Sequence, residues 1–222
     1  RAQVTEADGR AGFASLAAAA VIGPVWVCVV SAQGTLMLPL IVGELSKSLS
    51  LSTSSAGMFA TAALLGATAA AGVQVLLIRQ LSWRKMATAT ILTLIAAFAV
   101  LATRPGYAVS LACVATLGFG MGGGLSLANA AMANSGQQTR AVGLALGLMG
   151  LVGSLLAWLK PIVTTAQSDM GFYLMLIVVG VSGLVAARSL PDTAPTVRTS
   201  LSDRKSTPAV IGRSFFVALL AW

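Results

Sequence analysis

Six long apolar runs fill most of this 222-residue chain, and short polar segments separate them. Each run reaches or approaches the length of about 20 residues that a helix needs to cross a bilayer. The runs occupy residues 16–42, 56–78, 86–102, 107–131, 141–163 and 171–187. Only 9% of the residues are charged, whereas a soluble domain carries about 25%. The pattern therefore predicts an all-α transmembrane protein with six spans.

A short basic turn fixes the predicted orientation of these spans. Arg79, Arg84 and Lys85 lie between the second and third runs, with no acid among them. An Arg or Lys at the bilayer centre costs about 3 kcal/mol, and short loops rich in these residues stay in the cytoplasm. With the N-terminus inside, 11 of the 14 Lys and Arg residues lie on the cytoplasmic side. We therefore expect a bacterial inner-membrane protein with a cytoplasmic N-terminus.

The chain divides by composition into a tail, a bundle and a linker. We expect residues 1–13 to form a cytoplasmic tail, 14–188 the six-span bundle and 189–208 a cytoplasmic linker. The stretch 209–222 is apolar again and is interpreted as the start of a seventh span, which predicts a fragment of a longer polypeptide. Between the first two spans, a polar loop is expected at residues 43–55, where a run of hydroxyls is suited to cap the next helix.

Several classes of protein are disfavoured by what the chain lacks. The net charge is +8, but the cations lie at the ends of apolar runs rather than on one face, so no nucleic-acid partner is expected. There is no His, and both Cys fall inside apolar runs, so neither a metal site nor a cofactor is predicted. No nucleophile–base pair is recognisable, and an enzyme is not expected. No charged residue lies in the middle of a span, which excludes a carboxylate proton relay there.

Glycines at four-residue spacing mark two spans as candidates for close helix packing. Gly120 and Gly124 share a face of the fourth span, and Gly143 and Gly147 share a face of the fifth. Small residues at this spacing let two membrane helices approach closely. Tight packing and sliding during a conformational change are both compatible with these stripes, and the sequence does not separate the two.

Polar side chains inside the apolar runs are the candidates for a binding site. Ser31, Gln33 and Thr35 lie near the middle of the first span, and Asn129 lies towards the end of the fourth. Ser and Thr in a membrane helix commonly bond back to their own backbone. An amide has more donors and acceptors than one helix easily satisfies, so Gln33 and Asn129 are the stronger candidates.

The order of four short motifs resembles the major facilitator superfamily of transporters. The basic turn matches that family's turn between spans two and three at Leu77, Arg84 and Lys85, while Arg79 occupies the position of an acid. The glycine-rich stretch 117–122 resembles part of that family's fourth span, and residues 140–147 resemble the start of its fifth span. Leu190-Pro191 resembles the end of its sixth span. The resemblance identifies the chain as the N-terminal half of such a transporter.

This resemblance implies a fold and a mechanism. The fold would be a six-helix bundle of two inverted three-helix repeats, and the substrate would bind near the midplane between this bundle and a C-terminal half. The implied partners are the lipid bilayer, a small-molecule substrate and that missing half, in a protein that is monomeric when complete. The implied cavity residues are Trp26, Ser31, Gln33, Met37 and Asn129, and the implied gating-loop residues are Arg79, Arg84, Lys85 and Arg140.

Two functions remain open on the sequence alone. The first is secondary active or facilitative transport of a small solute by alternating access. The alternative is a membrane protein of the same fold that has no transport activity and acts in assembly or sensing. Arg79 in the position of the family's acid is the feature that motivates this alternative.

Overall fold

The structure is a computed structural model that describes residues 2–77, 80–167 and 170–190. Over these residues the chain forms six α-helices and no strand. They are α1 (Ala2–Ser48), α2 (Thr53–Leu77), α3 (Trp83–Ala102), α4 (Tyr107–Asn134), α5 (Gln138–Gln167) and α6 (Met170–Ala187). All six contain a stretch that is long and apolar enough to cross a membrane. The length and composition of these helices indicate a multi-pass membrane protein.

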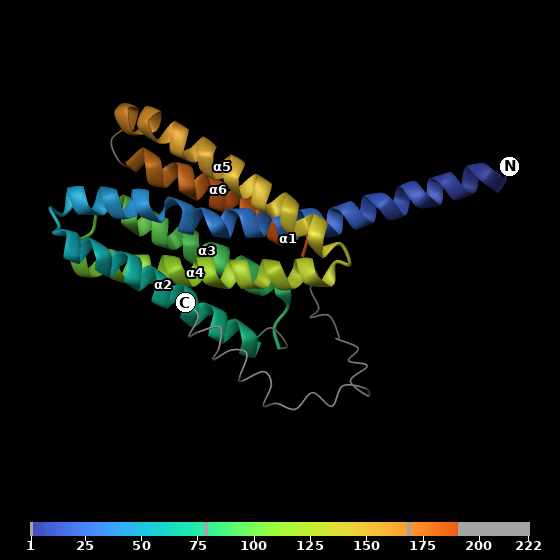
Figure 1. The fold of residues 1–222 in the computed structure, drawn as a ribbon, viewed down its shortest axis with the longest axis horizontal. Helices are drawn as coiled ribbons and strands as arrows, with labels where there is room; N and C mark the ends of the chain where they lie inside the picture. The colour runs from blue at the N-terminus through green and yellow to red at the C-terminus, as the bar shows by residue number, and fades with distance from the viewer. Residues whose placement is uncertain (1, 78–79, 168–169, 191–222) are drawn as a thin grey trace.

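The predicted spans are found in the expected order, but the first helix is longer than expected at both ends. α1 begins at Ala2, so most of the predicted tail is helical, and its first turns project beyond the bundle in Figure 1. The predicted loop at 43–55 is wrong, because α1 continues to Ser48 and only residues 49–52 connect it to α2. Pro24 and Pro39 lie inside α1 without ending it. Neighbouring helices and local adjustments tolerate such prolines in membrane helices.

Serine hydroxyls cap the starts of two helices. The Ser52 hydroxyl accepts the backbone N–H of Ser55 at 3.3 Å, as the run of hydroxyls in this connection predicted. The Ser82 hydroxyl accepts the N–H of Lys85 at 3.4 Å and forms the N-cap of α3. Each bond satisfies one of the backbone donors that a helix start leaves without a partner.

The helices pack around α1 and α4. α1 contacts each of the other five described helices, and α4 contacts α1, α2, α3 and α5. α2 and α5 make no contact with each other, and Figure 1 shows them on opposite sides of the bundle. Because neighbouring helices run in opposite directions, the connections 49–52 and 103–106 lie at one end, and 80–82 and 135–137 at the other.

Close packing between α2 and α4 depends on three glycines. A Cβ atom added to Gly118 or Gly122 of α4 would collide with the backbone of Ala63 or Ala67 of α2, respectively. A Cβ added to Gly66 of α2 would collide with the backbone of α4. The two helix backbones therefore touch, as small residues in membrane helices allow.

The glycines predicted to pack lie on other faces. A Cβ on Gly120 would lie 2.8 Å from the Leu94 side chain of α3, and one on Gly124 would collide with Ser31 of α1. Both glycines therefore lie in tight interfaces of the bundle. Within the described residues, nothing lies within 4 Å of the corresponding position at Gly143 or Gly147. Their role in packing stays a prediction.

The orientation gives a first testable prediction. Reporters that fluoresce only in the cytoplasm, fused after Leu81 or Gly136, are expected to be active, and those fused after Ser50 or Pro105 inactive. The physical reason is the excess of cations at the end of the bundle that carries connections 80–82 and 135–137. The reverse pattern at all four fusion sites would contradict the predicted cytoplasmic N-terminus.

Candidate functional site

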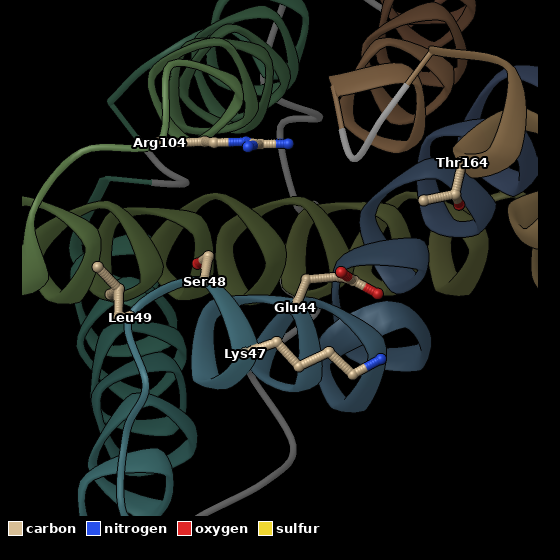
Figure 2. Close-up of a pocket in the computed structure, with 6 residues that line it drawn as sticks. All are labelled: Glu44, Lys47, Ser48, Leu49, Arg104 and Thr164. Carbon is tan, nitrogen blue, oxygen red and sulfur yellow. The ribbon is translucent and has the colours of Figure 1, made fainter.

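A polar pocket opens at the end of the bundle where α1, α3 and α5 finish. It has a volume of about 480 Å³. Three of its walls come from parts of the chain far apart in sequence: the last turns of α1, the turn between α3 and α4, and the end of α5. Figure 2 shows its lining residues, Glu44, Lys47, Ser48, Leu49, Arg104 and Thr164. The volume is within the range of about 300–1,000 Å³ that small-molecule sites occupy.

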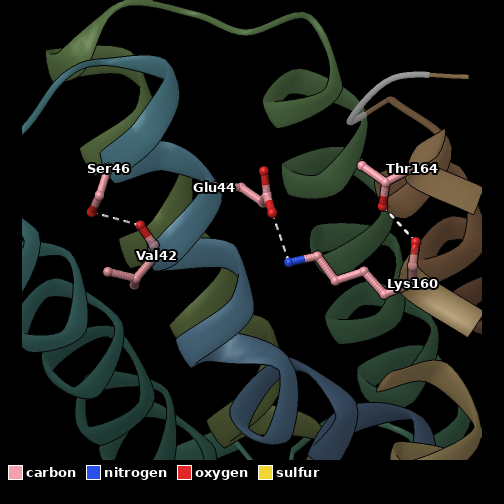
Figure 3. A network of polar contacts seen from close by, with 5 residues as sticks. All are labelled: Val42, Glu44, Ser46, Lys160 and Thr164. Carbon is pink, nitrogen blue, oxygen red and sulfur yellow. Dashed lines mark hydrogen bonds and ion pairs between the residues drawn. The ribbon is translucent and has the colours of Figure 1, made fainter. Parts of the chain in front are cut away.

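An ion pair beside this pocket joins α1 to α5. Lys160 Nζ lies 2.7 Å from Glu44 Oε1, and the two side chains are 15% and 13% exposed. Figure 3 shows the carboxylate and the ammonium pointing at each other across the gap between the two helices. The same ammonium lies 5.1 Å from the centroid of the Phe172 ring of α6, within range of a cation–π contact. One lysine therefore contacts α1 and α6 from its position on α5.

The extension of α1 positions the acid of this pair. Glu44 would lie in a loop if α1 ended at Val42, but the helix continues through Lys47 and places both side chains at the pocket. The hydroxyl of Ser46 donates to the carbonyl of Val42 at 2.7 Å, so this serine serves its own helix (Figure 3). Ser48 likewise donates to the carbonyl of Leu45.

Arg104 reaches the pocket from a strained turn. Its φ angle is +53°, in the left-handed region that favours glycine. Its backbone N–H donates to the carbonyl of Leu101 at 3.1 Å, which closes the end of α3. A non-glycine residue in this conformation costs roughly 1 kcal/mol. In Figure 2 the guanidinium extends over the pocket from the opposite side to Glu44 and Lys47.

Cations outnumber acids at this end of the bundle. Among the described residues, Lys47, Arg104 and Lys160 face the single acid Glu44. Across residues 2–77, 80–167 and 170–190, no group of three or more His, Cys, Asp or Glu side chains could hold a metal ion. The two hydroxyls in the lining, Ser48 and Thr164, donate to carbonyls of their own helices.

The four cavity candidates on α1 point towards different neighbours and do not converge on one pocket. Trp26 Nε1 donates to the Ser182 hydroxyl of α6 at 3.0 Å, and Ser31 packs against Gly124 of α4. Gln33 Nε2 donates to the carbonyl of Met149 on α5 at 3.4 Å. Met37 is 3% exposed in the apolar core of the bundle.

Gln33 retains a feature of a binding residue. It is 2% exposed, and its Oε1 atom has no hydrogen-bond partner among the described residues. A buried amide oxygen without a partner is rare in proteins, because the lost hydration is not replaced. Its Nε2 also donates to the carbonyl of Val29 in its own helix, at 3.3 Å. The amide therefore has one unused acceptor at the interface of α1 and α5.

The remaining predicted site residues lie at the opposite end of the bundle. Asn129 is exposed on α4. Lys85 and Arg140 are exposed in the first turns of α3 and α5, and Arg84, next to Lys85 in sequence, is half-buried. Arg79 lies outside the described residues. The role of these cations in gating stays a prediction.

The pocket was not predicted from the sequence, although the sequence carries a signal for it. Glu44 and Lys160 have opposite charges, and each lies near the end of an apolar run that finishes on the same predicted side of the membrane. Charged residues in such positions usually pair, because an isolated charge in a span is costly. Pairing these two residues would have placed α1 against α5.

The hydrogen bond of Trp26 gives a second prediction. Replacing Trp26 by Phe is expected to destabilise the purified protein by about 1 kcal/mol, because the indole N–H that the Ser182 hydroxyl accepts is lost and part of the half-buried ring is removed. The measurement is the unfolding midpoint in detergent. Ser182→Ala, which removes the acceptor and leaves the ring, is the matched control and should have a smaller effect. Equal midpoints for wild type and Trp26→Phe would contradict this contact.

Comparison with protein-family models, with curated proteins and with solved structures returned no match. The geometry of the bundle and its pocket therefore carries the functional argument.

Proposed function

We propose that this chain forms the N-terminal bundle of a secondary or facilitative transporter that moves a small solute across the membrane by alternating access. The resemblance of its motifs to the major facilitator superfamily motivates the proposal. Six helices of spanning length in one bundle are consistent with it.

The pattern of helix contacts supports an arrangement of two related halves. If the two halves are related, α1, α2 and α3 correspond to α4, α5 and α6, respectively. The α2–α4 contact then corresponds to the α1–α5 contact. Likewise, the α3–α4 contact corresponds to the α1–α6 contact, and the α1–α4 and α3–α6 contacts each correspond to themselves. All of these contacts are present in the described residues. Two contacts depart from the pattern within the described residues: α5–α6 has no α2–α3 counterpart, and α1–α3 has no α4–α6 counterpart. Inverted three-helix repeats would produce this near-symmetry.

One observation carries the proposal: the helix with the most neighbours is exposed in its middle. Thr35, Leu36 and Pro39 of α1 are exposed although α1 contacts all five other described helices. Gln33, with its unused amide oxygen, lies on the adjacent part of the same helix. A purely lipid-facing surface would favour apolar residues here. An exposed threonine and proline halfway along a central helix are typical of a face that lines a solute path.

Cysteine accessibility tests whether this face meets water. In a background without Cys28 and Cys113, a single cysteine is placed at Thr35, and a matched one at Val178 of α6, which is 68% exposed. The full-length protein is then treated with a membrane-impermeant thiol reagent from each side. We expect Thr35→Cys to react and Val178→Cys to stay unlabelled, since α6 is expected to face lipid.

Two outcomes separate the proposal from its alternative. Saturable solute uptake into proteoliposomes, with Thr35→Cys labelling that changes when solute is added, supports alternating access. A folded full-length protein whose Thr35→Cys is inert from both sides, and which carries no solute, would overturn the transporter. It would favour the alternative function in assembly or sensing.

A further inference from the structure

Gln33 is a buried amide whose hydrogen bonds are poor at both of its polar atoms. Its Nε2 donates to the carbonyls of Val29 and Met149 at 3.3 and 3.4 Å, longer than the range of about 2.7–3.2 Å of a well-formed N–H···O bond. Both carbonyls lie inside α1 and α5, where a helix carbonyl already accepts a backbone N–H. Its Oε1 has no partner among the described residues. The amide therefore gives up its hydration for little gain between the two helices.

The two carbonyls fix which way this amide points. The NH₂ group can donate to them, whereas the amide oxygen in its place would face two other acceptors. The oxygen must therefore point the other way, where it lies 3.4 Å from the position that a Cβ of Gly153 on α5 would occupy. Because Gly153 has no side chain, this residue leaves that position beside the acceptor unfilled.

Leu36 covers the same position from the exposed face of α1. Its Cδ1 atom lies 3.1 Å from the position of a Gly153 Cβ, and its side chain is 44% exposed. An exposed side chain changes rotamer within picoseconds to nanoseconds. Leu36 can therefore turn away from Gly153 without the movement of a helix. Gln33 Oε1 then becomes accessible from the face of α1 that carries the exposed Thr35.

The helices around this acceptor carry no charge in their middle parts. Residues 11–43 of α1, 107–134 of α4 and 141–159 of α5 include no Asp, Glu, Lys or Arg. An ion that entered between them would lose its hydration and gain no countercharge from these segments. An amide oxygen accepts a hydrogen bond from an O–H or N–H group. The acceptor therefore suits the donor group of an uncharged molecule.

We propose that Gln33, Leu36 and Gly153 form a subsite for a neutral solute that presents a hydroxyl or an amide N–H. Gln33 Oε1 accepts the hydrogen of that donor, and the absent side chain of Gly153 leaves space for the donor atom. Leu36 covers the subsite when the solute is absent. The inference rests on the proposed transport function and names the chemical class of its solute.

Three probes of similar size and different charge test this class. Mannitol is neutral, gluconate is an anion and glucosamine is a cation, and all three carry hydroxyl groups. Binding of each probe to the purified full-length protein is measured by calorimetry. We expect mannitol to bind more tightly than both charged probes. Tighter binding of gluconate or of glucosamine would overturn the neutral class.

Gln33→Met separates a binding role from a structural one. Methionine keeps the length of the side chain and removes both polar groups, so mannitol affinity should fall about fivefold, the scale of one neutral hydrogen bond. The unfolding midpoint in detergent should stay the same or rise, because a poorly paired buried amide is removed. A lower midpoint with unchanged mannitol affinity would show that the amide serves the α1–α5 contact, and would overturn the subsite.

Gly153→Ala tests the same position with the amide intact. The added methyl group would lie 3.4 Å from Gln33 Oε1, and the tip of the Leu36 side chain can shift to admit it. We expect mannitol affinity to fall about as far as in Gln33→Met. Gly150→Ala on the same helix, where nothing among the described residues lies within 4 Å, should bind mannitol as wild type does. Equal affinities for Gly153→Ala and wild type would overturn the subsite.

Leu36→Ala tests the cover. This substitution removes the side chain that must turn away before the solute enters, so mannitol affinity should rise. Leu36 is nearly half exposed, and the variant is therefore expected to fold. A loss of mannitol affinity in folded Leu36→Ala would overturn the role of this leucine as a cover.

Uptake into proteoliposomes keeps this inference apart from the transport function. Mannitol binding that follows the variant series, in a protein that carries no solute, would support the subsite and overturn transport. Saturable uptake of gluconate or glucosamine by a protein that does not bind mannitol would leave the transporter intact and overturn the neutral solute.

Discussion

Replacing Gly118 by Ala is expected to force α2 and α4 apart and to lower the stability of the bundle. The added Cβ would collide with the carbonyl group of Ala63, which belongs to a helix backbone and cannot move aside alone. Overpacking of this kind costs about 1–3 kcal/mol, and occasionally more. The measurement is the unfolding midpoint of the purified protein in detergent, together with its yield in the membrane fraction.

The chain provides a matched control for this substitution on another helix. Gly147→Ala also adds one methyl group inside an apolar helix, but nothing within the described residues lies within 4 Å of that position. Its midpoint should stay within about 0.5 kcal/mol of wild type, the usual range for a substitution away from packed features. Equal losses for Gly118→Ala and Gly147→Ala would contradict the α2–α4 interface. Equal losses at Gly118 and Gly122 are expected, because both approach the α2 backbone.

Lys160→Met is expected to destabilise the protein by about 2 kcal/mol, because it leaves the Glu44 carboxylate without its partner in a part-buried position. Both side chains are about one-seventh exposed, at 15% and 13%, so the loss should be smaller than for a fully buried pair. The cation–π contact with Phe172 is lost as well. The unfolding midpoint measures the total effect.

A double-mutant cycle isolates the pair from the other contacts of Lys160. Glu44→Gln alone leaves the ammonium unpaired, and the double variant Glu44→Gln, Lys160→Met removes both charges. Since a neutral pair avoids the cost of an isolated charge, the double variant should be more stable than Lys160→Met alone. Effects that simply add would contradict an energetic link between the ends of α1 and α5.

The number and order of the helices could be predicted from the sequence because they depend on local composition. A run of apolar residues long enough to cross a bilayer must be helical, since lipid offers no partner for an open backbone. The starts and ends were less certain. α1 passes through Gly43 and Glu44 to Ser48, where polarity suggested a loop, because a helix can present a charged residue when a partner on another helix receives it.

The partners of individual side chains could not be read from spacing. Gly118 and Gly120 are two residues apart, yet the first packs on α2 and the second on α3. Trp26 and Gln33 lie on one span, yet they bond to α6 and α5. Each face of a central helix meets a different neighbour, and which neighbour that is depends on how the other helices are arranged.

The sequence by itself determined that the described chain forms six helices long and apolar enough to cross a membrane, because hydrophobic length and the placement of charges act within each segment. Only the tertiary structure decided that Glu44 meets Lys160 and that Arg104 reaches the same pocket. These residues lie far apart in the chain, and their contact is a property of how the helices pack, which small residues such as Gly118 allow but do not specify on their own.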